Sequence, residues 1–155
     1  MTVGGIDLGV TGFLSVHTEA GDLVALEALP VANGRILVSS LVGLLVDTGV
    51  TDIVCEDVHA MPTGSKANFS MGLHLGTVLG IAGTLNRAVH LLKPAEWKRP
   101  MGVTKSGKEG KAQAREIASR VYPDWADNFT RVKDHDAAEA VLIGRAYTLR
   151  IVRTT

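Results

Sequence analysis

The first part of the chain alternates short apolar runs with turn residues. Residues 2–7, 13–18 and 23–29 are rich in β-branched or alternating apolar residues, and Gly- and Asp-containing turns separate them. This pattern is typical of three consecutive strands that form a meander. Two later apolar runs, at 51–57 and 89–94, predict two more short strands.

Longer segments carry apolar residues every three to four positions, as one face of an amphipathic helix requires. In the first of them this spacing extends from Ile36 to Val46 and stops at Gly49, a residue that commonly ends helices. The predicted helices cover residues 35–49, 68–88, 110–123 and 134–150.

The order of these elements predicts an α/β fold. Strands that follow one another directly pair antiparallel, whereas strands joined through a helix pair in parallel. We therefore expect a five-stranded mixed sheet, with three antiparallel strands followed by two parallel ones, flanked by helices in a single domain over residues 1–155. The first strand is expected near the middle of the sheet, beside the strand that ends at Glu56.

The formal net charge is zero, but the charges are segregated along the chain. Residues 1–92 hold three basic side chains against eight acidic ones, whereas residues 93–133 hold ten against five. A basic segment on an otherwise acidic protein suits a surface that binds phosphates. It is equally compatible with a solvated helix face, so charge alone does not decide between the two interpretations.

Composition excludes several classes of protein. No apolar run of membrane-spanning length occurs, and the N-terminus lacks the pattern of a signal peptide, so we expect a cytoplasmic protein without membrane contact. Cys55 is the only cysteine, which excludes a disulfide within the chain and a thiolate metal cluster.

Two acidic residues stand at the ends of predicted neighbouring strands. Asp7 ends the first apolar run, and Glu56 ends the apolar segment 51–57. A carboxylate at the end of a buried strand has to be paired, protonated or bound to a metal, because desolvating it alone is costly. Both residues are therefore candidates for a shared site.

The last predicted helix begins with a cluster of acids. Asp136 and Glu139 are three residues apart and so lie on one helix face, while Asp134 and His135 stand at the helix entrance. Capping of the helix explains Asp134 well, since aspartate favours that position. It does not explain Glu139, which lies inside the helix and directly precedes an apolar segment.

In these features the chain resembles the RuvC-type Holliday junction resolvases of the ribonuclease H-like superfamily. The similarity rests on the order of the elements and on the acids in "GIDLGVTG", "IVCED" and "DHDAAEAVLIG". Within the family the chain is most similar to phage-encoded RuvC-like endonucleases, because "KPAEWKR" and "GKAQAREIASRVYP" resemble the segment before the last helix in that branch. Glutamate at position 139 departs from the aspartate that is usual in cellular members.

The resemblance implies a ribonuclease H-like fold and a metal-dependent, structure-selective endonuclease that resolves Holliday junctions and other branched DNA. It implies that Asp7, Glu56, Asp136 and Glu139 are catalytic and bind two Mg²⁺ ions, which Mn²⁺ can replace. Asp134 or His135 remains an alternative third ligand. The expected location is the cytoplasm of a bacterium or of a phage-infected host cell. Hard cations of this kind prefer oxygen ligands, and two of them can activate water and stabilise both the attacked phosphate and the departing oxygen.

Candidate DNA contacts fall into two groups, a loop-and-helix segment before position 70 and the basic segment after position 100. They are Lys66, Asn68 and Phe69 in the first group and Lys105, Lys108, Lys111 and Arg115 in the second. Phe69 could act as a wedge that unstacks bases or could be the first core residue of its helix. Trp97 and Trp125 are interpreted as packing residues rather than as platforms for bases.

A homodimer is expected because symmetric cleavage of a four-way junction requires two active sites. The predicted helix 68–88 supports this expectation, since it carries a row of glycines that lower helix propensity. Such a row indicates close approach of another helix, either in the core or across a dimer interface. The glycines are Gly72, Gly76, Gly80 and Gly83.

Three other functions are compatible with parts of the sequence. A ribonuclease acting on RNA or an RNA–DNA hybrid would have the same fold and acidic site. The segment "DLGVTG" also resembles the first phosphate loop of actin-like ATPases and sugar kinases, but 155 residues leave no room for their second domain. A non-catalytic nucleic-acid-binding protein would not need four acids in this order.

Overall fold

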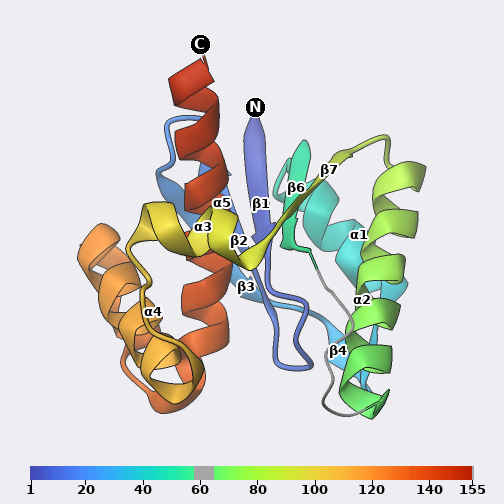
Figure 1. The fold of residues 1–155 in the computed structure, drawn as a ribbon. Coiled ribbons are helices and arrows are strands. Elements are labelled where there is room, and N and C mark those ends of the chain that lie inside the picture. The colour runs from blue at the N-terminus through green and yellow to red at the C-terminus, as the bar shows by residue number, and fades with distance from the viewer. Residues whose placement is uncertain (58–64, 155) are drawn as a thin grey trace.

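The computed structural model contains the expected five-stranded mixed sheet (Figure 1). The structure describes residues 1–57 and 65–154. The sheet has the order β3-β2-β1-β6-β7, in which β1, β2 and β3 pair antiparallel and β1, β6 and β7 pair in parallel. Its strands are β1 (Thr2–Ile6), β2 (Phe13–Thr18), β3 (Leu23–Ala28), β6 (Asp52–Glu56) and β7 (Ala88–Leu92). The predicted fold class and the central place of the first strand are thereby confirmed.

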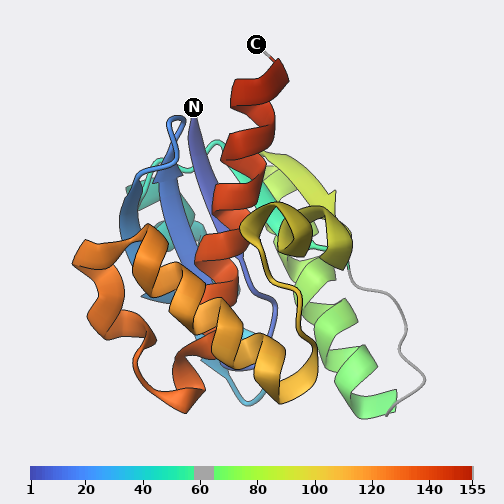
Figure 2. The same cartoon turned by 60° about the vertical axis from the view of Figure 1, so that its left-hand side comes forward.

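Helices cover both faces of this sheet (Figure 1). On one side α5 packs against β1 and β2, and α3 and α4 pack against α5. Figure 2 shows α4 crossing the lower part of α5. On the other side lie α1 and α2. The helices are α1 (Val38–Asp47), α2 (Ser65–Thr84), α3 (Pro94–Met101), α4 (Gly107–Val121) and α5 (His135–Thr154), with 3-10 turns η1 (Pro123–Phe129) and η2 (Val132–Asp134) before α5.

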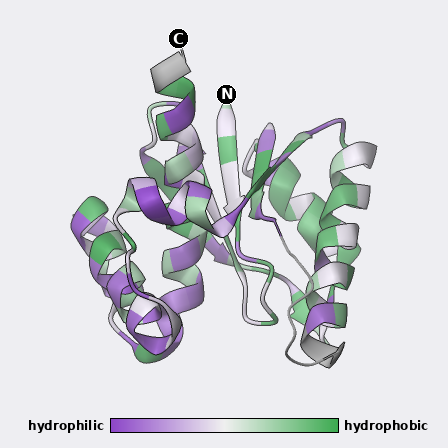
Figure 3. Ribbon diagram, viewed as in Figure 1, coloured by the Kyte–Doolittle hydropathy of each residue, from purple (hydrophilic) through white to green (hydrophobic). Residues whose placement is uncertain are grey.

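Each side of the sheet has its own apolar core. Trp97, Phe129 and Leu142 are fully buried or nearly so on the α5 side, and Leu41 and Ile53 are fully buried on the α1 side. Figure 3 shows that hydrophobic residues dominate α1, whereas hydrophilic residues are frequent along α4. The two layers therefore differ in the surface that they present.

Gly5 and Gly144 allow α5 to lie very close to the sheet. A Cβ atom at Gly5 would lie 2.5 Å from the carbonyl oxygen of Ala140, which is on α5. A Cβ atom at Gly144 would lie 2.4 Å from Nε2 of His17 on β2. Because neither distance is compatible with a side chain, the approach of α5 to β1 and β2 depends on glycine at both positions.

The buried His17 belongs to a polar network beneath α5. Its Nε2 lies 2.9 Å from the hydroxyl of Ser15, which also bonds to the carbonyl oxygen of Ala140 at 2.8 Å. Its Nδ1 lies 3.2 Å from the hydroxyl of Tyr122. Burial lowers the pKa of His17 to about 4, so the imidazole is neutral in the folded protein. This network connects β2 to the helices of the same side.

Several predicted boundaries are wrong. The helix expected from residue 35 begins at Val38, because Arg35–Ile36 forms a two-residue strand, β5, that pairs with β4 (Val31–Ala32). The second helix is α2, which ends at Thr84 rather than at residue 88, and the last strand begins at Ala88 instead of 89. The short helix α3 was not predicted.

The described part of the chain contains no helix that is both long enough and apolar enough to cross a membrane.

Candidate active site

The ends of two neighbouring parallel strands bring Asp7 and Glu56 to one edge of the sheet. The register pairs Ile6 of β1 with Cys55 of β6, and each acid is the next residue along its strand direction. Asp136 and Glu139 enter from the first turns of α5, which packs on β1. The strand register and the packing of α5 therefore bring acids that are distant in the sequence to the same region of the molecule, called the acidic cluster below.

Burial and neighbouring negative charges both act on the carboxyl group of Asp7. Burial, followed by the negative charges of Asp136 and Glu139, raises the pKa of Asp7 to about 8. The backbone N–H of Gly9 donates to Asp7 Oδ1 at 3.2 Å and opposes this shift. Without a compensating cation, Asp7 therefore holds a proton near neutral pH.

Glu139 lies between the other carboxylates and two lysines. Burial raises the pKa of Glu139, the charge of Lys98 partly offsets that rise, and the charge of Glu56 adds to it. Lys111 also favours the ionised form of Glu139. Glu139 is thus positioned where acidic and basic groups meet.

Asp136 is held from two directions. The hydroxyl of Thr11, in the turn between β1 and β2, donates to Asp136 Oδ2, and Nε2 of His135 lies 2.9 Å from Oδ1. The same Nε2 lies 2.7 Å from Nζ of Lys111, while Nδ1 of His135 faces the carbonyl oxygen of Val132 at 2.9 Å. His135 therefore connects α4 to the carboxylate and is placed beside the cluster.

Asp134 is engaged elsewhere. Its carboxylate accepts hydrogen bonds from the backbone N–H of Arg131 at 2.8 Å and from Nε of Arg131 at 3.0 Å. These bonds lower the pKa of Asp134 despite its burial. They close the 3-10 turn η2, so the structure gives Asp134 a capping role, whereas the negative charge of Asp136 acts on Asp7.

Trp97 makes a contact that the sequence did not indicate. Its indole Nε1–H donates to Glu56 Oε2 at 2.6 Å, and its side chain is fully buried on α3. The interpretation of Trp97 as a packing residue is correct but incomplete, because the ring also fixes an acid of the cluster. No local pattern could predict this bond, since its partners are 41 residues apart.

The donor set suits a hard divalent cation, because it consists of carboxylates whose mutual repulsion a cation would relieve. As the side chains are oriented, no three His, Cys, Asp or Glu groups within residues 1–57 and 65–154 lie close enough to hold one ion. Thr11 and Trp97 instead occupy oxygens of Asp136 and Glu56. Coordination by these residues therefore requires their carboxylates to turn or to exchange hydrogen bonds.

The basic residues predicted to contact DNA do not form one patch. Lys105 and Lys111 line a cavity of about 200 Å³ together with Lys98 and Glu139, next to the acidic cluster. Lys108 is exposed on the same helix, α4. The guanidinium of Arg115 instead donates to the carbonyl oxygen of Thr130 at 3.1 Å and faces η1.

The other predicted contacts lie at the start of α2. Phe69 is 69% exposed, so its interpretation as a core residue is wrong. Asn68 is half-buried, and the side chain of Lys66 lies outside the described residues.

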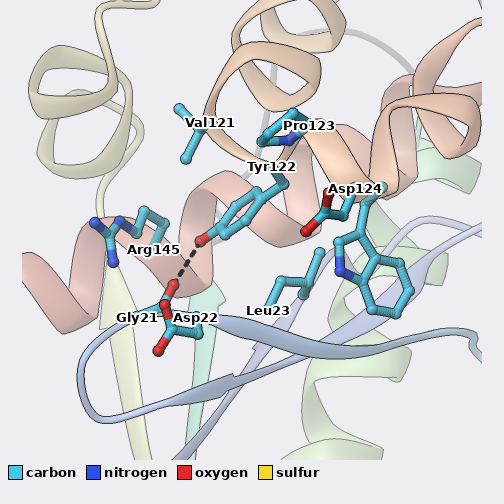
Figure 4. A pocket seen from close by; sticks show the side chains of 9 residues that line it. Gly21, Asp22, Leu23, Val121, Tyr122, Pro123, Asp124 and Arg145 are labelled. Carbon is cyan, nitrogen blue, oxygen red and sulfur yellow. Dashed lines mark hydrogen bonds between the residues drawn. The ribbon is translucent and has the colours of Figure 1, made fainter.

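A separate cavity of about 230 Å³ lies at the end of β2 that is remote from Asp7 (Figure 4). Its lining includes Asp22, Trp125 and Arg145, and the hydroxyl of Tyr122 donates to the carbonyl oxygen of Gly21 at 3.0 Å. This cavity contains none of the predicted site residues. Trp125 is therefore remote from the acidic cluster, unlike Trp97.

Comparisons with known proteins support the fold. No protein-family model matches the chain, and no curated protein does. Among solved structures, Thermus thermophilus RuvC in complex with a Holliday junction substrate has a TM-score of 0.77 and 16% identity, covering 99% of this chain and 96% of that chain. A second T. thermophilus RuvC structure has a TM-score of 0.74 and 18% identity, covering 100% and 98%.

A viral protein shows the same similarity. The Fowlpox virus resolvase in complex with Holliday junction DNA has a TM-score of 0.67 and 14% identity, covering 98% of this chain and 99% of that chain. At such low identity the similarity concerns the fold over almost the whole length. The chain therefore has the ribonuclease H-like fold of RuvC-type resolvases.

Proposed function

We propose that the chain is a metal-dependent, structure-selective endonuclease that resolves Holliday junctions and other branched DNA by phosphodiester hydrolysis. The observation that carries this proposal is the meeting of Asp7, Glu56, Asp136 and Glu139 at one edge of the sheet. The fold similarity to two resolvases solved with Holliday junction DNA supports it. The phage-like segments of the sequence, including the glutamate at position 139, support a place in the phage-encoded branch.

The carboxylates would hold a pair of Mg²⁺ ions, or Mn²⁺ in their place. When bound, such a pair activates a water molecule and stabilises charge on the attacked phosphate and on the leaving oxygen. Asp7, Glu56, Asp136 and Glu139 would hold the ions, with Asp136 and Glu139 also placed to orient the water. Burial and the neighbouring negative charges raise the pKa of Asp7, and a bound cation would favour its ionised form.

The lysines beside the cluster would bind the DNA backbone. Lys98, Lys105 and Lys111 line a cavity that opens next to Glu139, so a phosphate bound there would lie beside the carboxylates. Lys108 extends this basic surface along α4. Arg115 would contact DNA only by leaving its bond to Thr130. At the start of α2, the exposed Phe69 is available as a wedge at the junction, with Lys66 and Asn68 as phosphate contacts.

Two copies would associate through α2. Apart from the neighbouring turns of α2 itself, an added Cβ atom at any of its four glycines would meet no atom of the described residues within 4 Å, so these glycines do not serve packing inside the described part of the molecule. A cavity of about 420 Å³ lined by Val38, Val42 and Ile81 adjoins them. Self-association through this apolar face would give the C2 homodimer that symmetric cleavage needs.

Cleavage of labelled substrates tests the proposal. A four-way DNA junction, a linear duplex and an RNA–DNA hybrid are incubated with the protein, with and without Mg²⁺. We expect Mg²⁺-dependent cleavage of the junction, reduced about a thousandfold or more in Asp7→Asn, because the metal site supplies several kcal/mol of transition-state stabilisation. Asp47→Asn, at an exposed carboxylate of α1, is the matched control and should cleave normally.

The outcomes separate the alternatives. Cleavage of the hybrid but not of the junction would favour the ribonuclease, which shares the fold and the acids. Normal cleavage by Asp7→Asn would refute the assignment of the site. An inactive Asp134→Asn beside an active Asp136→Asn would move the third ligand by two residues and leave the nuclease proposal intact.

A further inference from the structure

The indole N–H of Trp97, the only hydrogen-bond donor of that side chain, contacts a carboxylate of the acidic cluster. A buried indole N–H requires an acceptor, and here that acceptor is Glu56 Oε2 at 2.6 Å. The side chain of Trp97 is completely buried, whereas its acceptor Glu56 is half-buried. The short distance and the charged acceptor are typical of a strong, directional hydrogen bond.

The helix that carries Trp97 is itself anchored. Glu96 accepts a hydrogen bond from the backbone N–H of Lys93 at 2.8 Å and so caps the start of α3. Oε1 of Glu96 also pairs with Arg150 of α5 at 3.2 Å. At the other end Gly102 adopts a φ of 77° that closes the helix. The indole therefore approaches Glu56 from a helix that is held at both ends.

Lys98 links Trp97 to a second carboxylate. Its Nζ lies 5.1 Å from the centroid of the Trp97 ring, within the range of a cation–π interaction. A cation above the ring withdraws electron density from the indole and makes its N–H a stronger donor. Lys98 also lines the cavity beside Glu139. The Trp97–Lys98 pair thus lies between Glu56 and Glu139.

We propose that Trp97 is a positioning residue, which fixes Glu56 through Oε2 and so makes Glu56 bind a divalent cation through its other oxygen. This inference rests on the proposed function, because it takes Glu56 as a metal ligand. Groups that orient a metal ligand by a hydrogen bond typically contribute tenfold to a hundredfold to metal affinity. Loss of the indole N–H should therefore weaken metal binding without disturbing the core.

The test compares metal affinity in proteins that differ in one N–H group. Mg²⁺ binding to the DNA-free protein is measured by titration calorimetry for the wild type, Trp97→Phe, and a protein with 3-benzothienylalanine at position 97. This analogue has the shape of tryptophan but carries sulfur in place of the N–H. We expect affinity to fall about tenfold to a hundredfold in both variants, with an unchanged urea midpoint for the benzothienyl protein.

Two controls make the result decisive. Trp125→Phe changes a tryptophan that is remote from the acids and should bind Mg²⁺ like the wild type. It also leaves Trp97 as the sole tryptophan, whose emission should change as Mg²⁺ binds at Glu56, and Glu56→Gln should abolish that change.

Wild-type affinity in the benzothienyl protein, together with weak binding by Glu56→Gln, would overturn the positioning role alone. Wild-type affinity in Glu56→Gln would instead show that Glu56 is not a ligand, which is a failure of the proposed function.

Discussion

The α5 side and the α2 side of the sheet differ in what surrounds their glycines. A Cβ atom at Gly144 would collide with His17, and one at Gly5 would collide with the backbone of Ala140. On α2 a Cβ atom at Gly76 would meet no atom of the described residues within 4 Å, apart from the neighbouring turns of α2 itself. Glycines on the α5 side therefore serve close contacts within the chain, whereas Gly76 and Gly80 of α2 line a cavity of about 420 Å³.

The acidic cluster and the proposed association surface lie on different sides of the sheet. Glu139, His135 and the lysines of α3 and α4 all lie on the α5 side, and the basic segment 93–133 belongs to that side as well. An interface through α2 would leave this surface open to DNA. The α5 layer thus carries most of the residues of the proposed site, while the proposed contact between two copies lies on the other layer.

The largest effect is expected where α5 contacts β2. Gly144→Ala should destabilise the protein by about 3 kcal/mol or more, because the new methyl group overlaps His17, whose ring is buried and hydrogen-bonded. Urea unfolding followed by circular dichroism measures the loss. An unchanged midpoint would mean that α5 can move away from the sheet, and the contrast between the two sides would disappear.

The buried network on the α5 side should make stability depend on pH. The pKa of His17 is about 4 in the folded protein and near 6.5 when unfolded, so the unfolded chain binds a proton first as the pH falls. The stabilisation is fully present above pH 6.5 and is lost towards pH 4, by about 3 kcal/mol in total.

The measurement compares the wild type with His17→Gln by urea unfolding between pH 4 and pH 7. Because other groups titrate equally in both proteins, the difference between their pH profiles isolates the contribution of His17. Parallel profiles would contradict the prediction and would indicate a hydrated imidazole.

On the α2 side a bulky side chain should change association rather than folding. Gly80→Leu adds a large group in open space, so the single chain should remain folded and gain about 0.5–1 kcal/mol in its free energy of unfolding, because leucine favours a helix more than glycine does. The same group would keep two α2 helices apart, and light scattering at micromolar concentration should give the monomer mass. A dimeric Gly80→Leu protein, or a wild type that is already monomeric, would exclude an interface at this position.

The smallest effect is a gain. Gly72→Ala, measured in the Gly80→Leu protein, should stabilise the single chain by about 0.5–1 kcal/mol, because alanine favours the helix and meets nothing at that position. Urea unfolding measures the gain. A loss of stability there would show that α2 is packed more closely within the chain than its surroundings indicate.

The sheet and the acidic cluster could be predicted because their signals are local. Apolar runs identified each strand of the large sheet, and the order of strands and helices then determined which strand ends are neighbours. The positions of Asp7 and Glu56 followed from that order. Their roles as ligands remain a prediction that the proposed cleavage assay addresses.

The errors have equally physical causes. Arg35 and Ile36 continue the helical spacing of the next segment, so their pairing with Val31 and Ala32 was hidden. The eight residues of α3 include Pro100 inside the helix, where proline normally argues against helical structure. The bond between Trp97 and Glu56 joins two separate elements and has no signature in either one.

The hydrogen bond from Thr11 to Asp136 spans 125 residues and has a consequence for synthesis. Asp7 and Glu56 are translated early, whereas Asp136 and Glu139 follow about 80 residues later. At about 5–20 residues per second, the roughly 80 residues between Glu56 and Glu139 take about 4–16 seconds to translate. During that interval a nascent chain carries only two of the four acids, so the proposed active site is complete only after α5 has been made.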